Sequence, residues 1–225
     1  MSGLPHIATV FSCDATSGGP IILRDFNFDI ETNGAPAIRN ACSVPFAMVD
    51  LFNVNHYEGE GGGDVFWENC AITGVKQRGG RFWGRQVDVE LDGTHFEVDG
   101  GTAWVFGLKT EGDINGENGF LWAHGGAKVE LLVAFNSVGG LKGPAYTIDE
   151  SDMTLIDLAF NIRKTAEPAL ATGDNVIVKE TGGGVTRLYR NDGSWVKGTG
   201  FGLFSGVGEP PHCFVRQSKG WRANK

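Results

Sequence analysis

Short apolar runs of similar shape recur along this chain, and they constrain its fold more than any other feature. Each has two or three apolar residues, a polar or glycine break, and then a renewed in–out alternation. The runs are 21–29, 46–54, 65–73, 82–90, 104–112, 130–138 and 154–162. Such runs between clusters of Gly, Asn and Asp are typical of strands and turns. Only 162–171 has a helical pattern, and Pro168 interrupts it. The sequence therefore predicts an all-β chain.

The breaks inside the runs mark a repeat of irregular length. The marks are Asp25, Asp50, Asn69, Arg85, Gly107, Ala134 and Asp157, at steps of 16 to 27 residues. This spacing suits the coils of a β-helix with insertions in its turns, because each coil buries its apolar face against its neighbours. A β-sandwich is the alternative, but tight hairpin signals are scarce until 176–190, which predicts a hairpin around Gly182, Gly183 and Gly184.

Composition excludes several classes of protein. The chain has 35 glycines, but 15 phenylalanines, 6 tryptophans and 41% hydrophobic residues indicate a packed core rather than disorder. A net charge of −8 without a clustered basic face argues against a nucleic-acid partner. No apolar run approaches the roughly 18 residues that cross a membrane, and residues 1–19 lack the pattern of a secretory signal.

The four cysteines are widely spread. Cys13, Cys42, Cys70 and Cys213 form no C-x-x-C pair for zinc or redox chemistry. Cys70 lies in a strand-like run, where a buried thiol acts as a small hydrophobe. Free, buried thiols are the favoured interpretation, with a Cys13–Cys42 disulfide as the alternative.

Two stretches resemble a known family. Residues 80–112, GRFWGRQVDVELDGTHFEVDGGTAWVFGLKTEG, and 178–193, VKETGGGVTRLYRNDG, followed by GFGLFSGV at 200–207, resemble the later coils of pectate lyase superfamily proteins. The resemblance implies a right-handed parallel β-helix, a single-stranded solenoid of about seven or eight coils with a C-terminal β-hairpin. We expect an irregular capping segment at 1–18, the β-helix domain at 19–207 and a tail at 208–225.

The resemblance also implies a function directed at polysaccharide. The chain lacks the R-x-P-x-x-R element of calcium-dependent pectate lyases and the N-T-D, D-D and G-H-G motifs of polygalacturonases. An enzyme, if this is one, would be a polysaccharide lyase or glycoside hydrolase, but binding is favoured over catalysis. The alternative is a structural protein, such as a virion fibre, surface-layer or filament subunit, built as a homo-oligomer or part of a larger assembly. We expect an extracellular or particle-associated protein. Because no secretory signal is present, an intracellular protein and a mature or truncated chain with an added Met1 are the alternatives.

One candidate catalytic group lies in 94–101. Strand alternation would point Phe96 and Val98 inward and leave His95, Glu97 and Asp99 outward, with His124 one coil later near Asp99. Two carboxylates beside a histidine suit general acid–base work on a glycosidic bond or a uronic acid. A simply solvated strand face fits the same pattern and is favoured.

Candidate binding residues follow the same logic. Lys109 would lie beside Asp88, among the carboxylates of neighbouring coils, where it could neutralise a uronate. The acidic residues of these coils could also bind Ca²⁺, the only possible cofactor. Ordinary cross-strand pairing is favoured. Trp67, Trp83, Trp104 and Trp122 fall on successive coils, where they could stack on sugars or, as favoured, on one another inside.

The repeated runs also predict the core. The residues expected to be buried are Phe26, Phe28, Leu51, Val54, Ile72, Val87, Val89, Leu108, Leu131, Val133 and Phe135.

Overall fold

The structure is a computed structural model, and it describes residues 9–28, 35–90, 93–114, 116–141, 143–162, 176–190, 203–204 and 214–218. Within these ranges the chain is all-β and contains no helix, as the strand-and-turn pattern predicts.

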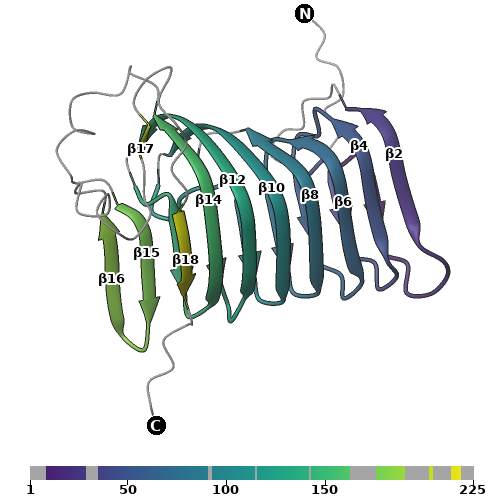
Figure 1. Cartoon of the computed structure of the whole chain (residues 1–225). Helices are drawn as coiled ribbons and strands as arrows, with labels where there is room; N and C mark the ends of the chain where they lie inside the picture. The colour runs from purple at the N-terminus through teal and green to yellow at the C-terminus, as the bar shows by residue number, and fades with distance from the viewer. Residues whose placement is uncertain are drawn as a thin grey trace, which may run out of the picture.

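Two large sheets, parallel except for β16 and β18, contain all of the strands in the described residues. Sheet A, in spatial order, is β1 (Phe11–Cys13), β3 (Ile38–Asn40), β5 (Tyr57–Gly59), β7 (Val75–Arg78), β9 (Phe96–Asp99), β11 (Leu121–His124), β13 (Tyr146–Asp149), β15 (Val176–Gly182) and β16 (Val185–Arg190). Sheet B is β2 (Ile21–Asn27), β4 (Phe46–Phe52), β6 (Asp64–Ile72), β8 (Arg81–Glu90), β10 (Thr102–Ile114), β12 (Lys128–Leu141), β14 (Asp152–Ile162) and β17 (Leu203–Phe204). From β1 to β15 consecutive strands alternate between the sheets, so this part of the chain winds as a solenoid-like stack (Figure 1).

Six strands of sheet B share a left-handed residue near the middle of the strand. Six residues with positive φ occupy equivalent places in β2, β4, β6, β8, β10 and β12. Strand pairing continues in register on both sides of them, except between β4 and β6, whose register ends directly before them at Val49 and Glu68. They are Asp25 (59°), Asp50 (52°), Asn69 (52°), Gln86 (54°), Gly107 (78°) and Val133 (63°). We call this column the bend. Four predicted breaks coincide with it, Arg85 and Ala134 miss it by one residue, and Asp157 is not among the left-handed residues.

The bend reverses the in–out alternation of each strand. Val105 is buried before Gly107 and Leu108 directly after it, so the parity of the inward positions changes from odd to even. This confirms the renewed alternation, and eight of the predicted core residues are buried, namely Phe28, Leu51, Val54, Ile72, Val87, Val89, Leu108 and Leu131.

Three core predictions are wrong. Val133 is itself the left-handed residue of β12 and is half-buried. Phe135 is 44% exposed because parity changes at Val133 and places Ala134 inside instead. Phe26 is 52% exposed on β2, the first strand of its sheet, which has a neighbouring strand on one side only.

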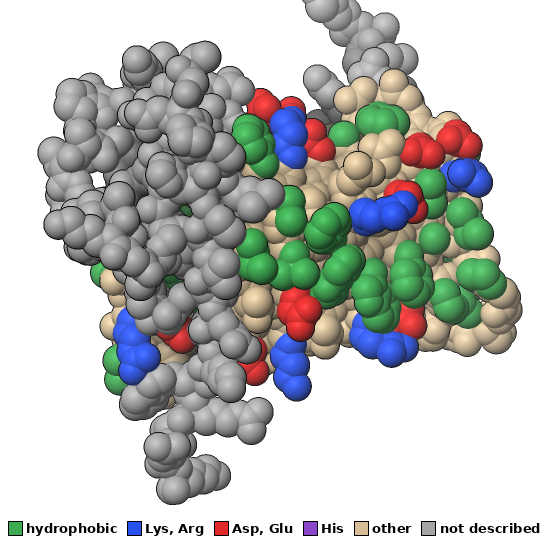
Figure 2. All heavy atoms as spheres, viewed as in Figure 1, with side chains coloured by type: hydrophobic (Ala, Val, Ile, Leu, Met, Phe, Trp, Pro, Cys, Tyr) green, Lys and Arg blue, Asp and Glu red, His purple; other side chains and the backbone are tan. Residues whose placement is uncertain are grey.

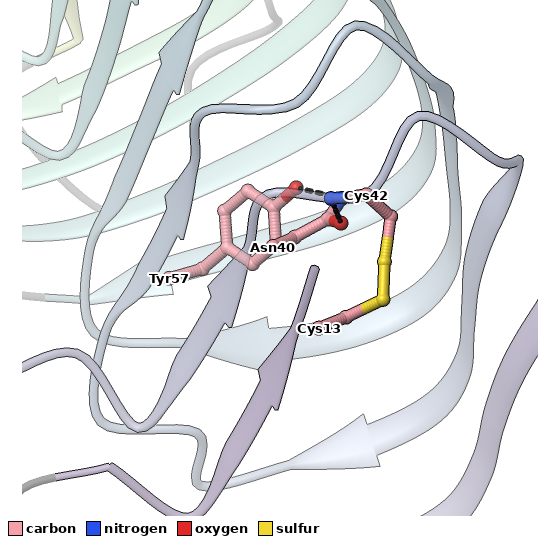
Figure 3. The surroundings of a disulfide bond; sticks show 4 residues. All are labelled: Cys13, Asn40, Cys42 and Tyr57. Atoms are coloured by element: carbon pink, nitrogen blue, oxygen red, sulfur yellow. Dashed lines mark hydrogen bonds between the residues drawn. A yellow bond between two sulfur atoms is a disulfide. The ribbon is translucent and has the colours of Figure 1, made fainter. Parts of the chain in front are cut away.

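The first coils are joined by a disulfide, which was the less favoured interpretation of the cysteines. Cys13 and Cys42 are bonded, with their Cα atoms 5.5 Å apart, and Cys70 is a buried free thiol. Asn40 organises this corner, because its side chain donates to the Tyr57 hydroxyl (3.1 Å) and accepts from the Cys42 amide (3.1 Å) (Figure 3). Burial raises the pKa of Cys70 to about 11. Cys213 lies outside the described residues.

The C-terminal part contains the only antiparallel strand pairs that the described residues form. β15 and β16 make the predicted hairpin, with Gly183 and Gly184 in left-handed conformations at its turn. β18 (Phe214–Ser218) pairs antiparallel with β14. β1 lies within 1–18 and β18 within 208–225, the two segments expected to be terminal cap and tail. No helix of the described part is long and apolar enough to cross a membrane.

Candidate functional site

The predicted site residues are divided among three outward surfaces and the interior. Sheet A presents Glu97, Asp99, Trp122 and His124. Sheet B presents Trp83 and Trp104 before the bend, and Asp88 and Lys109 after it. Trp67 and His95 are inside, with exposed fractions of 3% and 0%. The sequence therefore identifies mostly outward residues but not the separation that the fold imposes on them.

The sheet A residues form a connected polar group, which we call the His124 cluster. In the register of β9 and β11, Glu97 lies beside Trp122 and Asp99 beside His124. The His124 ring contacts both carboxylates, with Nε2 3.1 Å from Glu97 Oε1 and Nδ1 3.4 Å from Asp99 Oδ1. This is the proximity that the sequence predicted for His124 and Asp99.

Two further residues complete the cluster. Lys76 on β7 donates to Glu97 Oε1 at 2.8 Å, and sequence reasoning missed it because its strand is short and its partner lies on the next coil. The Trp122 ring stacks on His124, with centroids 3.8 Å apart and planes 22° apart. Both ring nitrogens of His124 therefore face a carboxylate of the preceding coil.

His95 is not part of this cluster, which corrects the prediction that it points outward. The amides of His95 and Phe96 both donate to the Phe120 carbonyl, at 3.1 and 2.8 Å. Because two consecutive amides donate to the same carbonyl, the pleat of the strand is interrupted and the in–out alternation begins only at Phe96. The side chains of His95 and Phe96 are therefore both buried. The His95 ring packs on Phe120, with centroids 4.8 Å apart.

The rest of sheet A's outer surface alternates in charge along the stack. Glu60 accepts from Arg39 at 2.6 Å and from Arg78 at 2.8 Å. His56 lies in the same region. Burial lowers its pKa below the ordinary value of 6.5, against an opposing influence of Glu58 and Glu97. This surface is polar from β3 to β11 and leads into the His124 cluster.

The surface of sheet B before the bend is aromatic, and we call it the aromatic face. It comprises Phe66, Trp83, Trp104 and Phe106 on β6, β8 and β10. Phe66 and Trp83 stack at 4.9 Å with planes 7° apart, and Trp104 and Phe106 at 6.0 Å with planes 12° apart. A shallow hollow of about 220 Å³ lies beside these rings. Figure 2 shows hydrophobic side chains gathered across this side of the molecule.

Trp67 lies on the other side of the same sheet. Its ring packs edge-on against Tyr57 (4.7 Å) and Phe82 (4.9 Å) in the core. Of the four tryptophans predicted to bind substrate, Trp67 alone is in the interior stack that the sequence favoured for all of them.

After the bend, Lys109 contacts three carboxylates. Its Nζ donates to Asp88 (2.8 Å), Glu111 (3.2 Å) and Glu90. Burial alone lowers the pKa of Lys109, but these hydrogen bonds outweigh it and raise the pKa above its ordinary value. Burial raises the pKa of Asp88, whose Oδ1 is buried without a hydrogen-bond partner. The predicted cross-strand pairing is therefore present, and the lysine occupies the centre of the acidic group. Among the described residues, no group of three or more His, Cys, Asp or Glu could hold a metal ion.

Comparisons with known proteins identify no relative. No family model matches the chain, and no curated protein or solved structure matches it at the threshold applied.

Proposed function

We propose that this chain is a right-handed parallel β-helix of the pectate lyase superfamily type that binds polysaccharide. Supporting this fold are the two parallel sheets, the strand alternation between them and the column of left-handed residues in sheet B. The right-handed sense rests on the strong preference of parallel strand crossovers for that hand. The Cys13–Cys42 disulfide supports an extracellular or particle-associated location, because such bonds persist in oxidising compartments.

The observation that carries the binding function is the His124 cluster. A half-buried tryptophan lies beside two carboxylates and a histidine on the outer surface of a sheet. Aromatic rings pack against the apolar faces of sugars, while carboxylates and imidazole accept or donate hydrogen bonds to hydroxyl groups. The surface extends along the stack, which suits a chain-like ligand.

Binding is better supported than catalysis. Glu97 contacts both Lys76 and His124, and Asp99 contacts His124, so both carboxylates are engaged by side chains of this chain. A general acid needs a raised pKa and a general base needs a free lone pair directed at substrate. The cluster therefore orients ligand hydroxyl groups rather than moving protons.

The test is affinity electrophoresis of the full chain in gels containing polygalacturonate, arabinoxylan or mixed-linkage β-glucan. At least one polymer should retard the protein, and Trp122→Ala should weaken that binding about tenfold, the loss expected for one stacking contact. Trp83→Ala on sheet B is the matched control and should change binding less than about twofold. Absence of binding to all three polymers, or equal losses in both variants, would contradict the proposal.

A further inference from the structure

We propose that the aromatic face of sheet B is the surface through which two copies of this chain associate. Phe66 and Phe106 are each 43% exposed, and Trp83 and Trp104 are half-buried between them. Contiguous exposed aromatic surface is characteristic of interaction sites, and Phe and Trp are enriched in protein–protein interfaces. This inference is independent of polysaccharide binding at the His124 cluster.

The stacking of the rings argues for a protein partner rather than a sugar. A sugar needs the open face of an aromatic ring, but Phe66 and Trp83 already cover one another nearly in parallel. The Arg81 guanidinium lies over Trp83, 5.3 Å from the ring centroid. What remains exposed is ring edges and phenylalanine, which has no polar group for a sugar hydroxyl.

The charged side chains on β6 and β8 that flank the aromatic face are paired within the chain. Arg81 binds Asp64 through two hydrogen bonds of 2.8 and 2.7 Å, and Arg85 pairs with Glu68. These four charges are therefore neutralised in pairs, and the unpaired Lys128 and Glu130 lie on β12, at the border of the aromatic face. An apolar, locally neutral surface is complementary to itself, which a two-fold interface between identical chains requires.

The strand spacing allows a second copy to pack against the aromatic face, and the area of the face sets the expected strength of the association. Parallel strands recur about every 4.8 Å, so two copies present ridges of equal spacing and can pack as facing sheets about 10 Å apart. The outward apolar positions continue from the aromatic face onto β4 and β2, at Ala47, Val49 and Ile22. These five strands, each with four or five residues before the bend, give a surface of roughly 360 Å² per copy. This is below the roughly 800 Å² per partner of a standard interface, which predicts a reversible dimer with a micromolar dissociation constant.

Sedimentation velocity of the full chain between about 1 and 100 µM tests the proposal, because this range brackets a micromolar constant. The wild type should shift from monomer to dimer, and the Phe66→Glu/Phe106→Glu variant should dimerise at least tenfold more weakly. Phe135→Glu is the matched control, since Phe135 is a phenylalanine of equal exposure on the same sheet after the bend. It should dimerise as the wild type does.

Two results would overturn the proposal. One is a wild-type monomer throughout the concentration range. The other is a dimer that Phe66→Glu/Phe106→Glu leaves intact, or that Phe135→Glu weakens equally. Circular dichroism verifies that each variant is folded, and the milder Phe106→Ser replaces the double variant if it is not. Because Trp122 lies on sheet A, polysaccharide retardation should persist in the dimerisation variants, so failure of either proposal is distinguishable from failure of the other.

Discussion

The outer surface of sheet A and the aromatic face of sheet B are built on the same coils but carry different chemistry. Sheet A uses strands of three or four residues from β3 to β13, and its outward positions between β3 and β11 are mainly charged side chains paired with the next coil. The aromatic face lies on longer strands, and its rings stack on one another. The interior between them is mainly apolar, with a few buried polar side chains such as His95 and Asn136.

The difference shows which residues of the stacked coils are not constrained by packing in the core. Side chains at inward positions must fill the core, so on both sheets the residue type there is determined by packing. Outward positions are not constrained by packing, and their chemistry reports how each surface is used. A polar, hydrogen-bonded surface and an apolar, locally neutral one on opposite sheets are suited to two different partners. The following predictions test this comparison in order of decreasing effect.

The largest effect should separate the two sides of sheet B. Trp67→Ala removes a ring from the core and should lower the free energy of unfolding by about 3–5 kcal/mol. Trp83→Ala, one strand away on the aromatic face, should lower it by less than about 1 kcal/mol because the ring is half-exposed. Urea denaturation measures both. Equal losses would show that the inward and outward assignment of these rings is wrong.

The next effect contrasts the lysines of the two sheets. Lys109→Met leaves three neighbouring carboxylates without their shared cation and should cost about 1 kcal/mol, reduced by salt because the site is partly exposed. Lys76→Met removes one contact, to Glu97, and should cost less than about 0.5 kcal/mol. Thermal unfolding at low and high salt distinguishes them. A larger loss for Lys76→Met would contradict the assignment of the denser ion network to sheet B.

A stabilising effect is expected at the bend. Val133 is β-branched and left-handed (φ 63°), a conformation that costs L-residues roughly 1–2 kcal/mol, whereas Asn tolerates it. Val133→Asn should raise the unfolding free energy by about 0.5–1 kcal/mol after its lost apolar contact is included. The adjacent Leu132→Asn, which relieves no left-handed residue, should destabilise. Chemical denaturation of both variants is the measurement, and stabilisation by neither would exclude strain at the bend.

The smallest effect concerns pH on sheet A. Burial lowers the pKa of His56 below 6.5, so the folded state favours its neutral form. The associated stability is present above the unfolded-state pKa and is lost as pH falls through the folded-state pKa. His56→Gln should therefore lose less stability than the wild type on acidification below pH 6.5. Melting curves across this range measure the difference, and identical pH profiles would remove His56 from the pH response.

Much of the fold follows from local pattern. The runs of alternating residues predict the strands, and the Asp, Asn and Gly breaks that mark the repeat coincide with four of the six left-handed positions. Gln86 and Val133 were missed because neither residue favours that conformation, and only the stacking of neighbouring coils places them there. The wrong prediction that Phe135 is buried has the same cause. Which residues of β12 point inward after the bend depends on which residue forms the bend.

The sequence predicted most residues of the candidate site but not how they are arranged. The alternation of Glu97 and Asp99, and their proximity to His124, follow from strand periodicity and one coil step. The burial of His95 does not, because it depends on a carbonyl of the next coil that accepts two consecutive amides. Lys76 was missed for a related reason, since its partner is distant in the sequence.

The sequence alone determined that this chain is all-β, that its strands repeat, and that 176–190 form a hairpin, because periodicity and turn residues act within a few positions. Only the tertiary structure decided which predicted residues share a surface. Residues on adjacent coils become neighbours through strand register, and the bend then places Trp83 and Lys109 on separate parts of sheet B, with His124 on sheet A. Register and bend are set by the packing of whole coils, so a local pattern cannot specify them.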